Sequence, residues 1–106
     1  MYSQSTYQQA LKEKFDDLAE QWSQQTGHES FFQRAALHPA YQQIIGMGPQ
    51  AIPFILRDLR ETHRHWFWAL RAITGESPIP DESKGNIREM VEAWLDWGCR
   101  NHYIDQ

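Results

Sequence analysis

The chain has 106 residues, which is long enough for one domain with a real hydrophobic core but too short for two independent cores. Its 41% hydrophobic and 13% aromatic residues exclude an intrinsically disordered chain, which has few aromatics and a high net charge. The net charge of −4 argues against general binding to polyanions but leaves room for a local basic patch. We therefore expect a single helical domain over residues 1–106.

One cysteine, Cys99, cannot form a disulfide within the chain, and the first 11 residues lack the basic and then apolar layout of a secretory signal. The longest apolar run is far shorter than the ~20 residues that a membrane-spanning helix requires. We therefore expect a cytoplasmic protein without a transmembrane segment.

The N-terminal part has the strongest helical pattern in the chain. Its apolar residues recur every three or four positions between Gln, Lys, Glu and Asp, as in a helix with one buried face. These apolar residues are Tyr7, Leu11, Phe15, Leu18 and Trp22. The pattern predicts a helix over roughly residues 5–25 that ends at Gly27, since glycine readily takes the left-handed conformation found at helix C-termini.

Proline and glycine divide the middle of the chain into short segments. Pro39 disfavours helix at the preceding residue and favours a new helical start, so we expect short helices over residues 30–37 and 39–45. The sequence Gly-Met-Gly-Pro at residues 46–49 predicts a hinge, and the helix that follows has one apolar side. This side consists of Ile52, Ile55, Leu56 and Leu59.

Two further helices are expected in the C-terminal half. One covers roughly residues 64–74 and ends at Gly75, and the two prolines within residues 76–80 predict an extended linker after it. The other has apolar residues with helical spacing and ends near Gly98. Its apolar residues are Ile87, Met90, Val91, Trp94 and Leu95.

No segment has the alternating pattern of a β-strand, so the sequence predicts an all-α fold. We expect a compact bundle of about five helices built around one helical hairpin. The predicted core contains Trp22, Trp66, Leu70, Trp94 and Leu95.

Three consecutive aromatic residues, Trp66, Phe67 and Trp68, are the most informative feature of the sequence, because one helix cannot point all three into one core. At about 100° per residue, Trp66 and Leu70 share one face of a helix, whereas Trp68 lies nearly opposite, beside Arg71. Trp68 therefore needs a second surface to contact.

Phe54 likewise lies off the apolar side of its helix, near Arg57. Phe54 and Trp68 are therefore either a second layer of internal packing or the centre of a surface that docks a partner. Internal packing under the N-terminal or C-terminal helix is one reading, because both of those helices are apolar on one side. Docking by at least one of the two is the other reading, because aromatic residues and arginine are frequent anchors of protein interfaces. The predicted partner-binding residues are Phe54, Arg57, Arg64, His65, Trp68 and Arg71.

Residues 44–59 and 65–75 resemble one helical hairpin of the HEAT-repeat type. The shared marks are a glycine-led turn, the pattern Ala-Ile-Pro-x-Ile-Leu-x-x-Leu from Ala51 to Leu59, and Ala-Leu-x-x-Ile from Ala69 to Ile73. The resemblance implies a surface that binds other proteins, or in some cases nucleic acids. It covers one hairpin, whereas a solenoid needs about three repeats, so the flanking helices are expected to act as caps.

A longer stretch, from His38-Pro39-Ala40-Tyr41 to Gly75-Glu76, is similar to a group of small, uncharacterised bacterial all-helical proteins. This resemblance implies a small bacterial helical domain. It implies no catalytic residue.

Cys99-x-x-His102 together with His63-x-His65 suggests a zinc site. On a regular helix, residues two apart diverge by about 200°, so the two residues of the His63 pair could share an ion only if the turn before Trp66 is non-helical. We expect surface histidines, no metal and no other cofactor.

The basic residues cluster between Arg57 and Arg71 among aromatic residues, a combination that can stack bases and neutralise phosphates. Asp58 and Glu61 lie within the cluster and can pair with its cations, so a solvated helix face is the alternative. The cluster consists of Arg57, Arg60, His63, Arg64, His65 and Arg71.

Catalytic signatures such as Gly-x-Ser-x-Gly, a phosphate-binding glycine loop or His-Glu-x-x-His are missing from the sequence, and its titratable groups are dispersed. We therefore expect a non-catalytic protein–protein interaction module, an adaptor or accessory subunit of a bacterial cytoplasmic complex whose partner is encoded nearby. The alternative is an antitoxin-like or nucleic-acid-associated regulator from a small operon.

Overall fold

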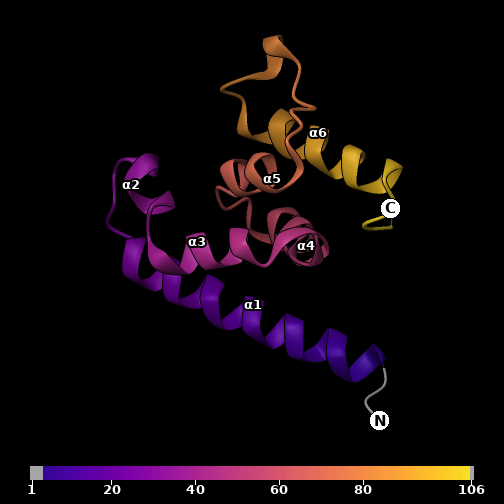
Figure 1. The fold of residues 1–106 in the computed structure, drawn as a ribbon. Coiled ribbons are helices and arrows are strands. Elements are labelled where there is room, and N and C mark those ends of the chain that lie inside the picture. Colours follow the sequence, from indigo (N-terminus) through magenta and orange to yellow (C-terminus); the bar gives the residue numbers. More distant parts are fainter. Residues whose placement is uncertain (1–3, 106) are drawn as a thin grey trace. The chain divides into compact units, whose positions relative to one another are not determined.

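The computed structural model describes residues 4–105, with side chains from residue 6 onward, and this part of the chain contains helices and no strand (Figure 1). The predicted all-α fold class is therefore confirmed. The α-helices are α1 (Gln4–Thr26), α2 (Phe32–Ala36), α3 (Pro39–Gly46), α4 (Ile52–Thr62), α5 (Phe67–Thr74) and α6 (Ile87–Arg100). Two short 3-10 helices are η1 (Gly48–Ala51) and η2 (Asp81–Ser83). None of the helices found within residues 4–105 is long and apolar enough to cross a membrane.

The helices form two compact units, each with its own packing. The first lies within Met1–Ala51 and the second within Ile52–Gln106. The division falls where η1 meets α4, directly after the predicted hinge at residues 46–49. The single domain expected over residues 1–106 stays a prediction.

In the first unit, α1 lies against α3 (Figure 1). Phe15, Leu18 and Trp22 of α1 are buried, whereas Leu11 is half-buried and Tyr7 is 53% exposed, so the predicted apolar face is buried only in its C-terminal part. Trp22 connects several elements, because its indole N–H donates to Ala35 O at 2.9 Å and its ring centroid lies 5.0 Å from that of Tyr41. A buried indole usually needs such an acceptor, so this contact fixes α1 on the short helices.

The short helices of the first unit follow the proline and glycine signals of the sequence. Pro39 is the first residue of α3, and His38 caps this helix by accepting the Ala40 N–H on Nδ1 at 3.0 Å. After α3, Gly48 has a φ of +73°, which strongly favours glycine. The predicted hinge is therefore a turn at Gly48, where the chain leaves α3.

In the second unit, α4 packs against α6 (Figure 1). The two helices approach closely at Gly98, where a Cβ atom would lie only 2.5 Å from Leu56 Cδ1. The sequence predicts a helix end near Gly98, and α6 ends two residues later, at Arg100, so that Gly98 lies inside its last turn. Gly98 serves close helix packing rather than helix termination.

The chain after α6 folds back over Gly98. His102 has a φ of +64°, and the Tyr103 N–H donates to Gly98 O at 2.9 Å, as in a left-handed helix cap. The Tyr103 ring stacks on Trp97 with centroids 5.4 Å apart, and Ile104 is buried. These contacts hold the C-terminal turn against α6.

The buried face of α6 is rotated relative to the sequence prediction. Trp94 is buried as predicted, but Leu95 is half-buried, Ile87 is exposed, and Trp97 is buried instead. Trp94 and Trp97 share one side of the helix with Gly98, so the side that carries the glycine is the one turned inward. The other predicted core residues, Trp22, Trp66 and Leu70, are all buried.

Candidate functional site

The turn between α4 and α5 lies in the middle of the residues that the sequence singles out. Residues 63–66 are not helical, and His63 has a φ of +56°, which is uncommon for a residue other than glycine. The Trp66 N–H donates to Arg64 O at 2.9 Å within the turn. As a result, α5 begins at Phe67, later than the helix predicted over residues 64–74.

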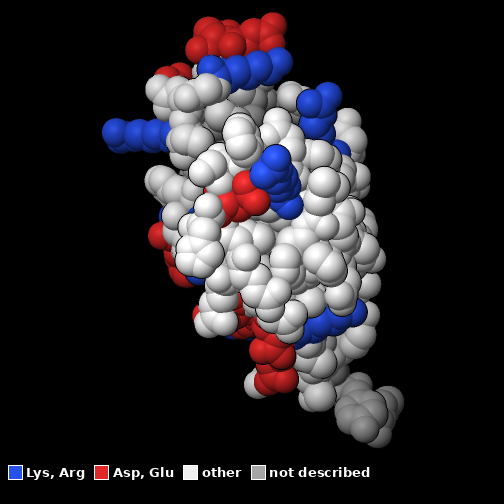
Figure 2. All heavy atoms as spheres, turned by 90° about the vertical axis from the view of Figure 1, so that its left-hand side faces the viewer, with Lys and Arg blue, Asp and Glu red and all other residues white. Residues whose placement is uncertain are grey.

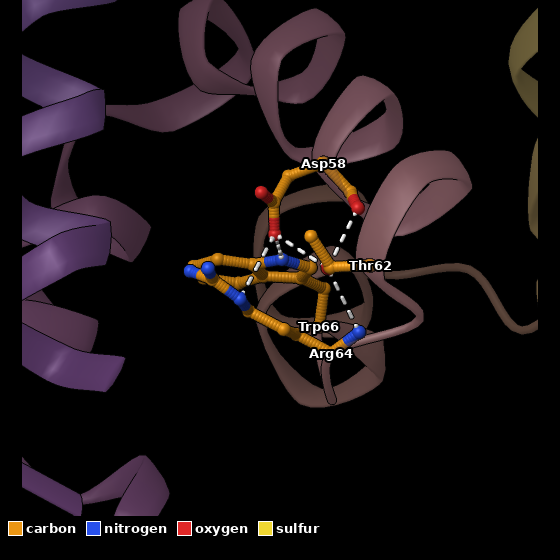
Figure 3. A network of polar contacts seen from close by, with 4 residues as sticks. All are labelled: Asp58, Thr62, Arg64 and Trp66. Carbon is orange, nitrogen blue, oxygen red and sulfur yellow. Dashed lines mark hydrogen bonds and ion pairs between the residues drawn. The ribbon is translucent and has the colours of Figure 1, made fainter. Parts of the chain in front are cut away.

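The carboxylate of Asp58, near the end of α4, holds this turn (Figure 3). Trp66 Nε1–H donates to Asp58 Oδ2 at 2.6 Å, and the Thr62 hydroxyl lies 3.0 Å from the same oxygen. Arg64 Nε lies 3.9 Å from Asp58 Oδ2, and the Arg64 backbone N–H donates to Thr62 Oγ1 at 3.1 Å. We call these four residues, Asp58, Thr62, Arg64 and Trp66, the Asp58 network.

The Asp58 network is partly buried, which makes its hydrogen bonds important. Trp66 is completely buried, and its indole N–H has an ionisable acceptor in Asp58. Hydrogen bonds to a charged acceptor are stronger than neutral ones, and a buried donor that loses its acceptor costs about 1–3 kcal/mol. The network therefore fixes the beginning of α5 relative to the end of α4.

One side of α5 is buried and the other is exposed. Phe67, Ala69 and Leu70 are buried. The exposed residues, which we call the α5 face, are Trp68, Arg71 and Ala72. Their spacing of i, i+3 and i+4 places them on one side of the helix. Trp68 is 41% exposed.

The other predicted partner-binding residues differ in their surroundings. Phe54 is only 7% exposed, so it is a packed residue of α4 and not part of an exposed surface. Arg57 is exposed, whereas Arg64 and His65 are half-buried in the turn. The structure thus places Arg64 in the Asp58 network and Trp68 in the α5 face.

His65 is held by packing. Its ring meets the Phe67 ring edge-on, with centroids 5.0 Å apart and an interplanar angle of 78°. Burial lowers the pKa of His65, and a backbone hydrogen bond opposes this shift. The neutral imidazole is therefore favoured in the folded protein.

The turn at residues 63–66 is non-helical, which is the condition for His63 and His65 to share a metal ion. Within the described part of the chain, however, no three His, Cys, Asp or Glu side chains are arranged to hold a metal ion. Cys99 and His102 line a separate open hollow of about 320 Å³ at the end of α6. The other residues around this hollow are Asp96, Arg100, Ile104 and Asp105.

One cation of the basic cluster predicted from the sequence is partly neutralised, because Arg64 lies beside the Asp58 carboxylate. Arg60 donates to the uncharged backbone O of Asp105 at 3.0 Å and keeps its charge. Figure 2 shows one face of the molecule, on which Lys and Arg atoms form separate small groups, several of them next to Asp or Glu atoms.

The Asp58 network could not be found from helical periodicity. The only local signal is the spacing of Asp58 and Thr62, one helical turn apart, which favours a side-chain contact. The indole of Trp66 reaches the same carboxylate only because the chain reverses through a non-helical turn. No spacing rule for a regular helix predicts that contact.

No family model, curated protein or solved structure matches the chain.

Proposed function

We propose that this chain is a non-catalytic protein-binding module and that its α5 face is the contact surface. The observation that carries the proposal is the exposure of Trp68, at 41%, on a helix whose adjacent aromatic residue, Phe67, is buried. Tryptophan and arginine are strongly enriched among the residues that dominate binding energy. The α5 face has one of each, Trp68 and Arg71, one helical turn apart.

The way in which α5 is held supports this proposal. Binding is weakened by the cost of ordering side chains and loops, so rigidly presented anchors bind better. The Asp58 network fixes the turn directly before α5, with Trp66 as its completely buried member. Trp68 is therefore presented by an ordered helix.

We further propose that the partner is another protein encoded nearby and that the chain acts as an adaptor or accessory subunit in the bacterial cytoplasm. Arg57, which is exposed on α4, and the half-buried Arg64 and His65 of the turn are further proposed contacts. Phe54 is left out of it because this side chain is buried.

A nucleic-acid-associated regulator is the second candidate, favoured by the pairing of Trp68 with Arg71 on one helix face. Proteins that bind nucleic acids usually neutralise several phosphates. Here Arg64 already lies 3.9 Å from the Asp58 carboxylate, which leaves one cation fewer for a phosphate backbone.

Affinity purification at low salt from the native host tests the proposal, with the wild type, Trp68→Arg and Phe31→Arg compared side by side. Phe31 is a matched control, because it is an exposed aromatic residue outside the second unit. We expect a stoichiometric protein with the wild type and the control but not with Trp68→Arg. With the purified partner, Trp68→Ala should weaken binding by about 30-fold or more.

The proposal is wrong if Trp68→Arg folds normally and retains every partner of the wild type. Recovery of nucleic acid alone, removed by salt, would favour the regulator instead.

A further inference from the structure

The turn and helix that present Trp68 carry positive charge and no negative charge. Residues 63–75 contain two arginines and two histidines but neither aspartate nor glutamate, and Arg71 is the one charged residue of α5. The chain as a whole has a net charge of −4. The α5 face is therefore a locally basic surface on an acidic protein.

Two carboxylates near this stretch are engaged with other groups, whereas Glu61 is exposed at the end of α4. Asp58 accepts the indole N–H of Trp66 at 2.6 Å, and Glu76 accepts the indole N–H of Trp97 at 3.1 Å. Among the side chains described, those of residues 6–105, none forms a salt bridge with Arg71. Arg71 is exposed, so its guanidinium is accessible to an acceptor on a partner.

Trp68 and Arg71 of the α5 face lie close together because they are three residues apart on one helix. Residues three apart on a helix have Cβ atoms about 5–6 Å apart, so a partner that covers the Trp68 indole also covers Arg71 or lies against it. Removing a guanidinium from water is unfavourable unless an acceptor replaces the water. A carboxylate is the best acceptor available on a protein, because it matches the two-pronged geometry of arginine.

We infer that the partner is an acidic protein segment that places a carboxylate against Arg71 and apolar side chains against Trp68. This inference rests on the proposed protein-binding function and adds the chemistry of the partner. A protein partner is favoured over a nucleic acid because the α5 face has a single cation, which suits one carboxylate better than a row of phosphates.

Selection of a phage-displayed peptide library on the immobilised full chain tests this chemistry and does not require the partner to be identified first. We expect the selected peptides to combine Asp or Glu with Leu, Met, Phe or Tyr a few positions away. Arg71→Glu should weaken the best peptide about tenfold or more, and Trp68→Ser should weaken it about 30-fold or more. Selection on Arg71→Glu should yield peptides with Lys or Arg instead.

Arg88→Glu is the matched control, because Arg88 is an exposed arginine of another helix whose Nε lies 3.4 Å from Glu92 Oε1. This variant should bind the selected peptides like the wild type. Circular dichroism of each variant distinguishes a lost contact from a lost fold.

The possible outcomes separate the inference from the proposed function. Peptides that need Trp68 but contain no acidic residue, and that bind Arg71→Glu as well as the wild type, would overturn the inference and leave the proposed function intact. A selection without any Trp68-dependent peptide would overturn both. Tighter binding of a labelled 20-nucleotide single-stranded DNA than of any peptide, lost in Arg71→Glu, would assign the α5 face to nucleic acid.

Discussion

Replacing Asp58 with alanine should destabilise the second unit substantially, because three groups use one carboxylate oxygen. The largest loss is the acceptor of the completely buried Trp66 indole, 2.6 Å away, and such a charged hydrogen bond contributes about 1.5–3 kcal/mol. The Thr62 hydroxyl has one proton and also lies 2.8 Å from the backbone O of residue 58, so it keeps an acceptor in the variant. The Asp58 side chain is 19% exposed, so entering water replaces part of the loss at Trp66. We expect a loss of about 1.5–3 kcal/mol in the free energy of unfolding.

Asp58→Asn keeps an acceptor oxygen and removes the charge, so its loss should be smaller, about 1 kcal/mol. Urea unfolding followed by tryptophan fluorescence measures both variants. A double-mutant cycle with Trp66→Phe, which removes the indole donor, isolates the contact and should give a coupling of at least about 1 kcal/mol. The reasoning would be refuted if Asp58→Ala unfolds at the same urea concentration as the wild type, or if the coupling is absent.

Two further predictions concern His65 and Gly98. Burial lowers the pKa of His65, so as the pH falls the imidazole is protonated in the unfolded chain before it is protonated in the folded protein. The contribution of neutral His65 to stability is therefore complete above about pH 6.5 and declines as the pH falls below that value. His65→Gln should therefore lose less unfolding free energy than the wild type between about pH 7.5 and pH 5.5 in urea titrations, and equal losses would contradict the assigned cause. Gly98→Ala should cost about 1–3 kcal/mol, measured by thermal unfolding, because its Cβ would lie 2.5 Å from the buried Leu56 side chain. Gly46→Ala, where a Cβ meets no atom within 4 Å, is the control and should be neutral or stabilising.

Periodicity in the sequence predicts the helices well where one face of a helix is buried against one neighbour. The buried positions Phe15, Leu18 and Trp22 of α1 follow the predicted spacing. The same approach predicts the outward position of Trp68, which is exposed. In these cases the angle around the helix axis decides burial, and that angle follows from the sequence.

Helical periodicity mispredicts which residues are buried where the buried arc of a helix is wider than its apolar stripe, or where two helices approach each other closely. Phe54 lies off the main apolar stripe of α4 and is nevertheless buried, because the buried arc of this helix is wider than one stripe. Leu95 fits the predicted stripe of α6 but is half-buried, whereas Trp97 is buried, since packing at Gly98 sets the orientation of the helix. The distance between two helices cannot be read from either helix alone.

In the candidate site, too, the sequence predicts which residue is buried but not the contact that buries it. Trp66 is buried as predicted, but it precedes α5 and is buried through the turn and its bond to Asp58 rather than through a helical angle. A side-chain contact between residues eight positions apart depends on how the chain reverses between two helices, and helical spacing does not encode that reversal.

The uneven exposure of the five tryptophans gives the protein a spectroscopic reporter of its own. Trp22, Trp66, Trp94 and Trp97 are each at most 5% exposed, whereas Trp68 is 41% exposed. An aqueous quencher such as iodide should therefore act mainly on the emission of Trp68. Occupation of the α5 face should shield this one indole from the quencher and shift its emission to the blue, so that contact with a partner can be followed without an attached dye.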